Sequence, residues 1–398
     1  MKKILSAVAL ASLAFTTAFA DAKMSLNYRT QAFAYQYDST SEIHNYLNLE
    51  KYGAAQDDVT FKVAGDAAGV TVTIDPYTSF ATGSGSFKLN EYSAYAKFGA
   101  FQLDAGQYKN GKSNGNYQLK NDADACNLGG ESWAAYKLGS IFSKTKTTFI
   151  DDIANVNGGD TAQAMLLTYV RDFDEATLTL TGSLIGVANW NDESQSGFGL
   201  RADVKFETFD HQIVFKSDNE KNLAVSYHLQ ALALVPSTKI TFGGAFAIVG
   251  GSINEYNVDL RARYAEGPLS ITFMNNYSWI QSASIVGKAV GAYAGSYALL
   301  DKDKTYTSAM WNLLAARYKL NDTMFVIGQI GDIIPMKSGE RDANGIMMFA
   351  MPGFQVFAGG KTSITTGLRL GLSNIADDLD STDVEYSLSV PLVMRVRF

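Results

Sequence analysis

The chain is poor in the residue types on which small exported proteins and metal sites depend, with one cysteine, three histidines and six prolines in 398 residues. The lone Cys126 cannot form an internal disulfide, so the fold must be stabilised in another way. The cysteine and the scattered histidines lack metal-ligand spacing, and no acidic run resembles a calcium loop. His44, His211 and His228 also form no pattern with a serine or paired acids. We therefore predict no enzyme activity, no metal and no cofactor.

Long apolar runs and an excess of positive charge are missing too. Beyond the first 20 residues, no stretch of about 20 apolar residues could form a spanning helix. A net charge of -7 and a pI of about 5.1 exclude the basic face that a nucleic-acid partner requires. Yet 46% of residues are hydrophobic while the mean hydropathy is -0.05, so apolar and polar residues must be finely interleaved. In hydrocarbon only helices and closed barrels satisfy the backbone, which leaves a barrel as the spanning option.

The first 20 residues have the pattern of a secretory signal peptide. Lys2 and Lys3 give a basic start, residues 4 to 19 are an apolar run, and Ala18 and Ala20 are small residues suited to signal peptidase. We predict cleavage after Ala20. No cysteine follows this position, so lipid anchoring is not expected. The mature chain is predicted to be one domain spanning residues 21–398.

Many segments alternate with a period of two, as the strands of a transmembrane barrel do. Between 198 and 206, apolar Phe198, Leu200 and Val204 share one face, and charged residues occupy the other. The same alternation occurs in residues 177–188, 223–229, 240–248 and 256–264. Less regular strands are expected near 24–37, 43–51, 58–75, 86–97 and 100–108. A soluble β-sandwich also alternates, so the connections must distinguish the two folds.

The connections alternate between tight turns and longer polar segments. Tight turns are predicted at Asp210, Pro236, Gly267, Asn321 and Gly359. Moderate connections are predicted at 217–221 and 250–254, and long ones at 281–308, 332–345 and 373–383. Short periplasmic turns opposite longer extracellular loops are typical of outer-membrane barrels. We predict an all-β fold, a transmembrane antiparallel β-barrel of about 18 strands, with 16 as the main alternative.

The last strand carries the most specific motif. Leu392, Met394, Val396 and Phe398 share one apolar face, and the chain ends on that aromatic residue. This terminus resembles the assembly signal of bacterial outer-membrane porins, and the Tyr, Phe, Gly and Asn content resembles spirochaetal, including treponemal, porin-like proteins. The resemblance implies an outer-membrane location, contact with outer-membrane lipids, recognition by the assembly machinery, a pore and, by analogy with general porins, a homotrimer.

A barrel of 16 to 18 strands leaves an aqueous channel, which predicts transport. By alternation, candidate pore-lining residues are Arg201, Lys205, Arg261, Arg263, Arg369, Arg395, Asp203, Asp259 and Glu385. Such charges either select solutes or pair with neighbours to stiffen the wall. The predicted function is passive diffusion of small hydrophilic solutes and ions. The alternatives are a surface adhesin or antigen on a barrel scaffold and a substrate-specific gated transporter.

Two long connections are candidates for entering the pore. Residues 109–130 form the third long loop, which in general porins narrows the channel, so that Lys120, Asp122 and Asp124 become constriction candidates; a surface loop is the alternative. Residues 281–308 are too apolar for a solvated loop, and an in-folded plug, an extra hairpin or a subunit contact would bury them. Long polar loops facing outward would suit recognition of host molecules.

Overall fold

The computed structural model describes twelve stretches of the chain, and the other residues, including 1–20, lie outside this description. The described residues are 21–38, 48–51, 58–79, 84–109, 161–185, 197–218, 223–280, 308–337, 340–341, 347–359, 362–373 and 385–397. The strands are β1 (Asp21–Asp38), β2 (Asn48–Lys51), β3 (Asp58–Ala64), β4 (Ala68–Ser79), β5 (Ser84–Phe98), β6 (Phe101–Lys109), β7 (Thr161–Asp172), β8 (Ala176–Ile185), β9 (Gly197–Phe206), β10 (Phe209–Asp218), β11 (Leu223–Val235), β12 (Thr238–Val249), β13 (Ser252–Glu266), β14 (Leu269–Ile280), β15 (Ser308–Lys319), β16 (Met324–Lys337), β17 (Glu340–Arg341), β18 (Met347–Phe357), β19 (Ser363–Gly367), β20 (Arg369–Ser373) and β21 (Glu385–Arg397). Among these residues no helix is long and apolar enough to cross a membrane.

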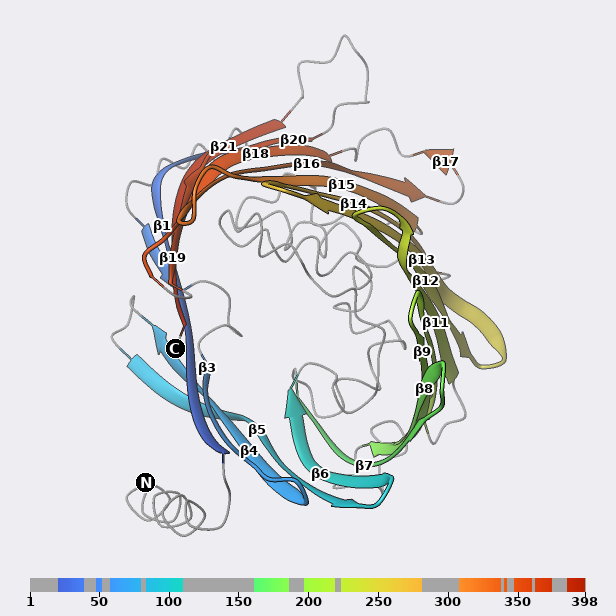
Figure 1. Cartoon of the computed structure of the whole chain (residues 1–398). Helices are drawn as coiled ribbons and strands as arrows, with labels where there is room; N and C mark the ends of the chain where they lie inside the picture. The colour runs from blue at the N-terminus through green and yellow to red at the C-terminus, as the bar shows by residue number, and fades with distance from the viewer. Residues whose placement is uncertain are drawn as a thin grey trace.

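All strands belong to one antiparallel sheet whose pairings run round a ring (Figure 1). From β3 to β16 each strand pairs with the next in sequence, and β16 pairs with β18. β1 pairs with β3 on one side and with β21 on the other, from Asn27 opposite Arg397 to Asp38 opposite Ser387. The first and last strands are thus neighbours, so the pairings return to their start. Tyr37 and Tyr386 meet across this seam with ring centroids 5.5 Å apart.

At three positions in the ring, two short strands lie end to end where a single strand would otherwise run; each strand position in the ring is called a stave below. β2 and β3 both pair with β1, β17 and β18 both pair with β16, and β19 and β20 both lie between β18 and β21. Treating each interrupted pair as one stave reduces the 21 strands of the described chain to eighteen staves. This agrees with the predicted strand number.

The two sides of the sheet differ in chemistry. Most outward residues are apolar, and Leu200, Leu314 and Phe354 are 57%, 42% and 52% exposed although they lie in mid-strand. Inward residues one position away, such as Leu313 and Gln355, are 1% and 2% exposed. Aromatic contacts lie at both ends of the outer face, with Phe98, Phe101 and Tyr169 near one rim and Tyr256, Tyr277 and Trp279 near the other. An apolar belt between aromatic girdles is the surface that a bilayer requires.

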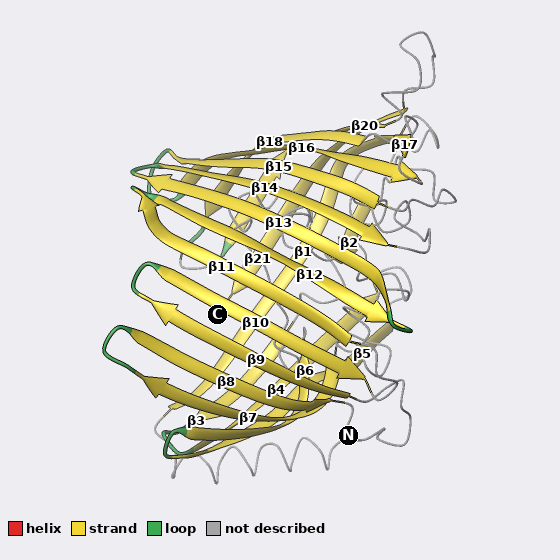
Figure 2. Cartoon of the chain, turned by 90° about the vertical axis from the view of Figure 1, so that its right-hand side faces the viewer, coloured by secondary structure: helices red, strands yellow, loops and turns green. Residues whose placement is uncertain are grey.

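Short turns lie at one rim of the barrel (Figure 2). Pro236, Gly267, Asn321 and Gly359 lie between strands there, as predicted. The Asn321 turn is held by its own side chain, since Oδ1 accepts hydrogen bonds from the backbone N–H groups of Thr323 (3.0 Å) and Met324 (2.9 Å). The longer connections leave from the other rim, so the predicted asymmetry of the two rims is confirmed.

Four boundaries predicted from the sequence are wrong. The long connection expected at 332–345 begins too early, because β16 continues to Lys337 and Asp332 is paired within it. Asp210 lies in β10 opposite Lys205, and the turn is at 207–208; a polar residue is tolerated within the strand because this register position faces the lumen. The segment 58–75 is not one strand but the hairpin of β3 and β4, because the chain turns at residues 65–67 and the phase of the alternation changes there. The expected loop at 250–254 is a two-residue turn, which Gly250 and Gly251 permit with φ values of 59° and 83°.

Candidate functional site

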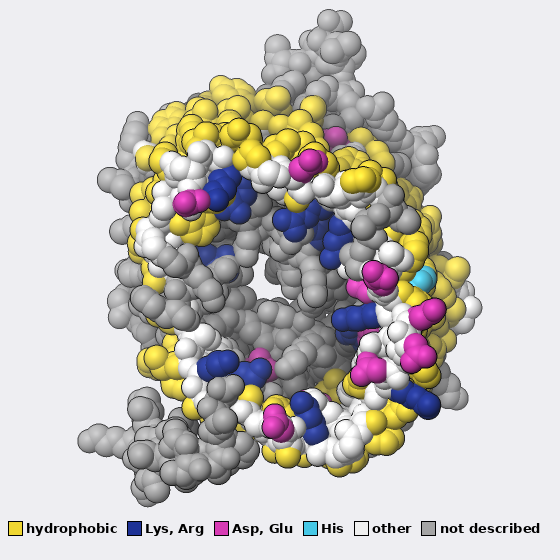
Figure 3. Space-filling view, viewed as in Figure 1, with side chains coloured by type: hydrophobic (Ala, Val, Ile, Leu, Met, Phe, Trp, Pro, Cys, Tyr) yellow, Lys and Arg dark blue, Asp and Glu magenta, His cyan; other side chains and the backbone are white. Residues whose placement is uncertain are grey.

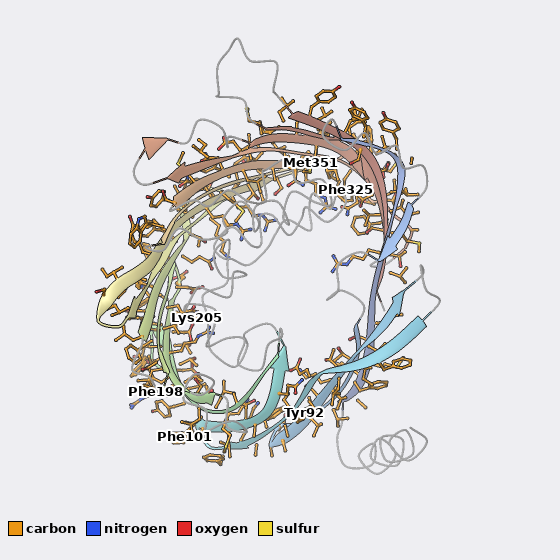
Figure 4. All side chains as sticks on the ribbon, turned by 180° about the vertical axis from the view of Figure 1, so that it is seen from behind. Tyr92, Phe101, Phe198, Lys205, Phe325 and Met351 are labelled. Atoms are coloured by element: carbon orange, nitrogen blue, oxygen red, sulfur yellow. The ribbon has the colours of Figure 1, made fainter. Side chains whose placement is uncertain are left out.

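The inner wall of the barrel is the candidate site, because its side chains differ from the apolar outer belt. Lys and Arg side chains line the central opening, and acidic side chains lie among them (Figure 3). Figure 4 shows Lys205 on the inner side of the wall, and Phe198 and Phe101 on the outer side. Strand alternation produces this division, because neighbouring residues point to opposite faces.

On β9, three predicted pore-lining residues have different environments. Arg201 donates to both carboxylate oxygens of Asp203, from Nε to Oδ2 at 2.5 Å and from NH2 to Oδ1 at 2.8 Å. Gln212 on β10 donates a third hydrogen bond to Asp203 at 2.8 Å. Lys205 is exposed on the lumen side. The first pair therefore neutralises itself, whereas the Lys205 ammonium, opposite Asp210 in the strand pairing, is exposed to the lumen.

A basic cluster lies on the inner face of β12, β13 and β15. Lys239 is directly opposite Arg263, and Arg261, which is 6% exposed, is opposite Thr241 on the same two strands. Arg317 on β15 has the same inward orientation, one strand beyond β14. Four cationic side chains within four neighbouring staves give this part of the wall a positive potential.

Arg317 was missed by the sequence analysis. Its guanidinium carbon lies 3.6 Å from the ring centroid of Phe325 and 5.6 Å from that of Phe357. Phe325 packs against buried Ile327 and Met351, so the cation lies on an apolar patch of the inner wall. No alternation revealed it, because apolar residues occur on both faces of β15.

The remaining predicted residues divide into three groups. Arg395 on β21 is half-buried and lies opposite Ser363. Asp259, Arg369 and Glu385 hold register positions opposite Gly243, Ser389 and Ser373, but their side chains lie outside the described part of the structure. The constriction candidates Lys120, Asp122 and Asp124 and the terminal Phe398 also lie outside it. Leu392 and Met394 of the predicted assembly signal are exposed on the outer face, and Val396 shares their register parity.

Three solved structures show which proteins share this architecture. The chain is similar to the outer membrane protein OpdK from Pseudomonas aeruginosa, with a TM-score of 0.54 and 9% identity, covering 96% of this chain and 100% of that one. It is similar to OccK2 (OpdF) from Pseudomonas aeruginosa in complex with glucuronate, with a TM-score of 0.56, 9% identity and coverage of 96% and 98%. An anion-selective porin from Comamonas acidovorans matches with a TM-score of 0.53, 12% identity and coverage of 95% and 99%. The fold is that of bacterial outer-membrane porins.

Comparison of the sequence alone finds no such similarity. No family model matches the chain, and no curated protein matches it. At these low identities the porin fold is set by the alternation and the strand pairings rather than by shared residues. Within the described residues no group of His, Cys, Asp or Glu is arranged to hold a metal ion. The features of this porin-like barrel that bear on solutes are therefore the inward charges.

Proposed function

We propose that the chain is an outer-membrane porin for passive diffusion of small hydrophilic solutes, with a preference for anions. The observation that carries the proposal is the sign of the inner wall. Among described inward side chains, the basic ones are Lys23, Lys62, Lys97, Arg201, Lys205, Lys239, Arg261, Arg263, Arg317, Lys319 and Arg395, and the acidic ones are Glu91, Asp104, Asp172, Asp203 and Asp210. Fixed charges of one sign along a pore concentrate the opposite ion.

The chemistry of the structural neighbours supports the same preference. One is named an anion-selective porin, and two channels were solved with glucuronate and vanillate, which both carry a carboxylate. In this chain, the cluster of Lys239, Arg261, Arg263 and Arg317 is the part of the wall best suited to attract such a group. A guanidinium binds a carboxylate through two parallel hydrogen bonds, whereas a lysine acts as a point charge.

The alternatives from the sequence differ in what supports them. A substrate-specific gated transporter is supported by Arg317 on its apolar patch, because that arrangement offers both a charge and an apolar surface to a solute. The adhesin alternative depends on connections that lie outside the described residues, so it stays a prediction. Recognition of the last strand by the assembly machinery also stays a prediction.

Single-channel recording in a planar bilayer tests the proposal. The refolded protein should give steady conductance steps, and its reversal potential under a salt gradient should have the sign of an anion-permeable pore. The double variant Lys239→Gln/Arg263→Gln should lower the anion-to-cation permeability ratio about two-fold or more, because it removes two adjacent lumen charges. Arg171→Gln is the matched control, since Arg171 lies on the outer face beside Phe173, 5.0 Å from its ring centroid.

The possible results separate the parts of the proposal. Cation preference in the wild type would contradict anion selection but leave a porin. A folded barrel without conductance steps would contradict the porin function and favour a plugged transporter or an adhesin. An equal change in the control variant would show that the effect does not arise from the inner wall.

A further inference from the structure

Three polar side chains form a hydrogen-bonded row across β14, β15 and β16. Asn275 donates from Nδ2 to Oδ1 of Asn312 at 2.7 Å, and Asn312 donates from Nδ2 to Oδ1 of Asp332 at 2.8 Å. The three residues are directly opposite one another in the strand pairing. Both amides thus donate toward the carboxylate, which ends the row.

This row lies on the outer face of the barrel. It shares its register parity with Phe273, Leu314 and Ile330, which are 37%, 42% and 54% exposed, whereas inward Met274 and Leu313 are 3% and 1% exposed. The row is also within the apolar belt, because outward neighbours on both sides along each strand are apolar or aromatic. These flanking residues are Phe273 and Tyr277, Leu314 and Met310, and Ile330 and Ile334.

A carboxylate in this position conflicts with a surface that faces only lipid tails. Hydrocarbon offers no hydrogen-bond partners, and ionisable side chains within a membrane usually mark a functional contact. No other carboxylate with a described side chain faces outward between apolar neighbours of its own strand. The alternation that elsewhere keeps described carboxylates away from the apolar belt is therefore broken at Asp332.

We propose that the row is the contact with a second copy of this chain, related by a two-fold axis that passes near Asn312 along the membrane normal. All copies insert with the turn rim on the same side, so such an axis is compatible with the membrane. A two-fold contact presents the same patch from both copies. The axis places Asn312 next to Asn312 of the second copy. It also places the Asn275 end of each row beside the Asp332 end of the other row, so amide donors approach the carboxylates.

The composition of the outer face favours this arrangement over the trimer expected from general porins. In a three-fold assembly a patch contacts a different patch of the next copy. The row would then face a different part of the outer surface, whose described residues are mostly apolar, and the contact would not bring the amides of a second row to the carboxylate. The two-fold contact is the arrangement in which this chain supplies its own complementary group.

Cross-linking in vesicles tests the contact without altering the row. In a Cys126→Ser background, Leu314→Cys places a thiol on the outer face of β15 next to Asn312. Leu103→Cys is the matched control, an outward leucine of similar exposure (39% against 42%) on β6, across the ring in Figure 1. With a short bismaleimide and purified protein in phospholipid vesicles, Leu314→Cys should give a dimer band at least five-fold stronger than that of the control. Adding Asp332→Leu should reduce that band several-fold.

Folding and function are checked on the same samples. Each variant must keep the slow, unheated migration in SDS gels and the conductance of the parent barrel, so a misfolded protein is recognised. Equal cross-linking at Leu314→Cys and Leu103→Cys, no effect of Asp332→Leu, or a mass of three copies in mild detergent would each overturn the proposal. Because conductance is measured independently, failure of the dimer leaves the proposed porin function untouched.

Discussion

At the scale of single residues, the face of the sheet on which a side chain lies could be predicted from the sequence, but its hydrogen-bond partner could not. Alternation placed Arg201, Asp203 and Lys205 on one face, and the structure confirms this. It gave no means of knowing that Arg201 and Asp203 bind each other while Lys205 remains exposed, because the choice depends on rotamers and on Gln212 from the next strand. For Arg317 even the face could not be predicted, because β15 has apolar residues on both faces.

Asp203 is expected to control both stability and selectivity. Asp203→Asn removes the carboxylate that accepts three hydrogen bonds from Arg201 and Gln212, so the free energy of unfolding should fall by about 1–3 kcal/mol. It also deletes a negative charge and leaves the Arg201 charge uncompensated, so the reversal potential should shift toward anions. Lys205→Gln is the comparison, and it should shift selectivity toward cations with little loss of stability. The two readouts are urea unfolding in vesicles and bilayer recording; an unchanged reversal potential in Asp203→Asn would contradict the argument.

At the scale of elements, the hairpin of β3 and β4 shows why a turn can be hidden. Apolar residues alternate on both sides of the turn, at 59, 61 and 63 and again at 70, 72 and 74, and only a short break with a change of phase separates the two runs. In the structure, Tyr95 of β5 contacts the residues at this turn. Its hydroxyl donates to the carbonyl of Gly65 at 2.8 Å, and its ring lies over Gly69. An aromatic ring covering a glycine in the neighbouring strand is a contact that the sequence does not announce.

Gly69 should therefore not tolerate a side chain. A Cβ at this position would lie 2.4 Å from Cε1 of Tyr95, so Gly69→Ala must displace the ring and weaken its hydrogen bond to Gly65. We expect a loss of about 1–3 kcal/mol in the free energy of unfolding. Gly182→Ala is the control, because its Cβ would meet only Cδ2 of Leu200, at the ordinary distance of 3.8 Å. Both variants are compared by urea titration in vesicles, and equal stability would show that Tyr95 does not constrain this position.

At the scale of the whole molecule, the number of staves and the asymmetry of the rims could be predicted, because both depend on strand period and connection length. The pairing of first and last strands could not be read from local patterns. Its register includes an irregularity between Phe33 and Tyr35, and only the assembled sheet defines it. The same limit applied to the outer face, where the Asn275, Asn312 and Asp332 row appears only when three strands are aligned.

The seam between β1 and β21 allows a test of the closed ring and its register together. Ala32 is directly opposite Leu392, whereas Met394 is opposite Thr30, two residues further along the same face. Directly opposed Cα atoms in an antiparallel pair are about 4.5–5.5 Å apart, within the range of a disulfide, and diagonal positions are less favourable. In a Cys126→Ser background, Ala32→Cys/Leu392→Cys should therefore oxidise within the folded barrel. The bond joins residues far apart in sequence, so the boiled, unreduced chain should migrate faster in an SDS gel and return to normal migration on reduction. Ala32→Cys/Met394→Cys should oxidise much less, and equal yields would mean that the register of the seam differs from the one in the structure.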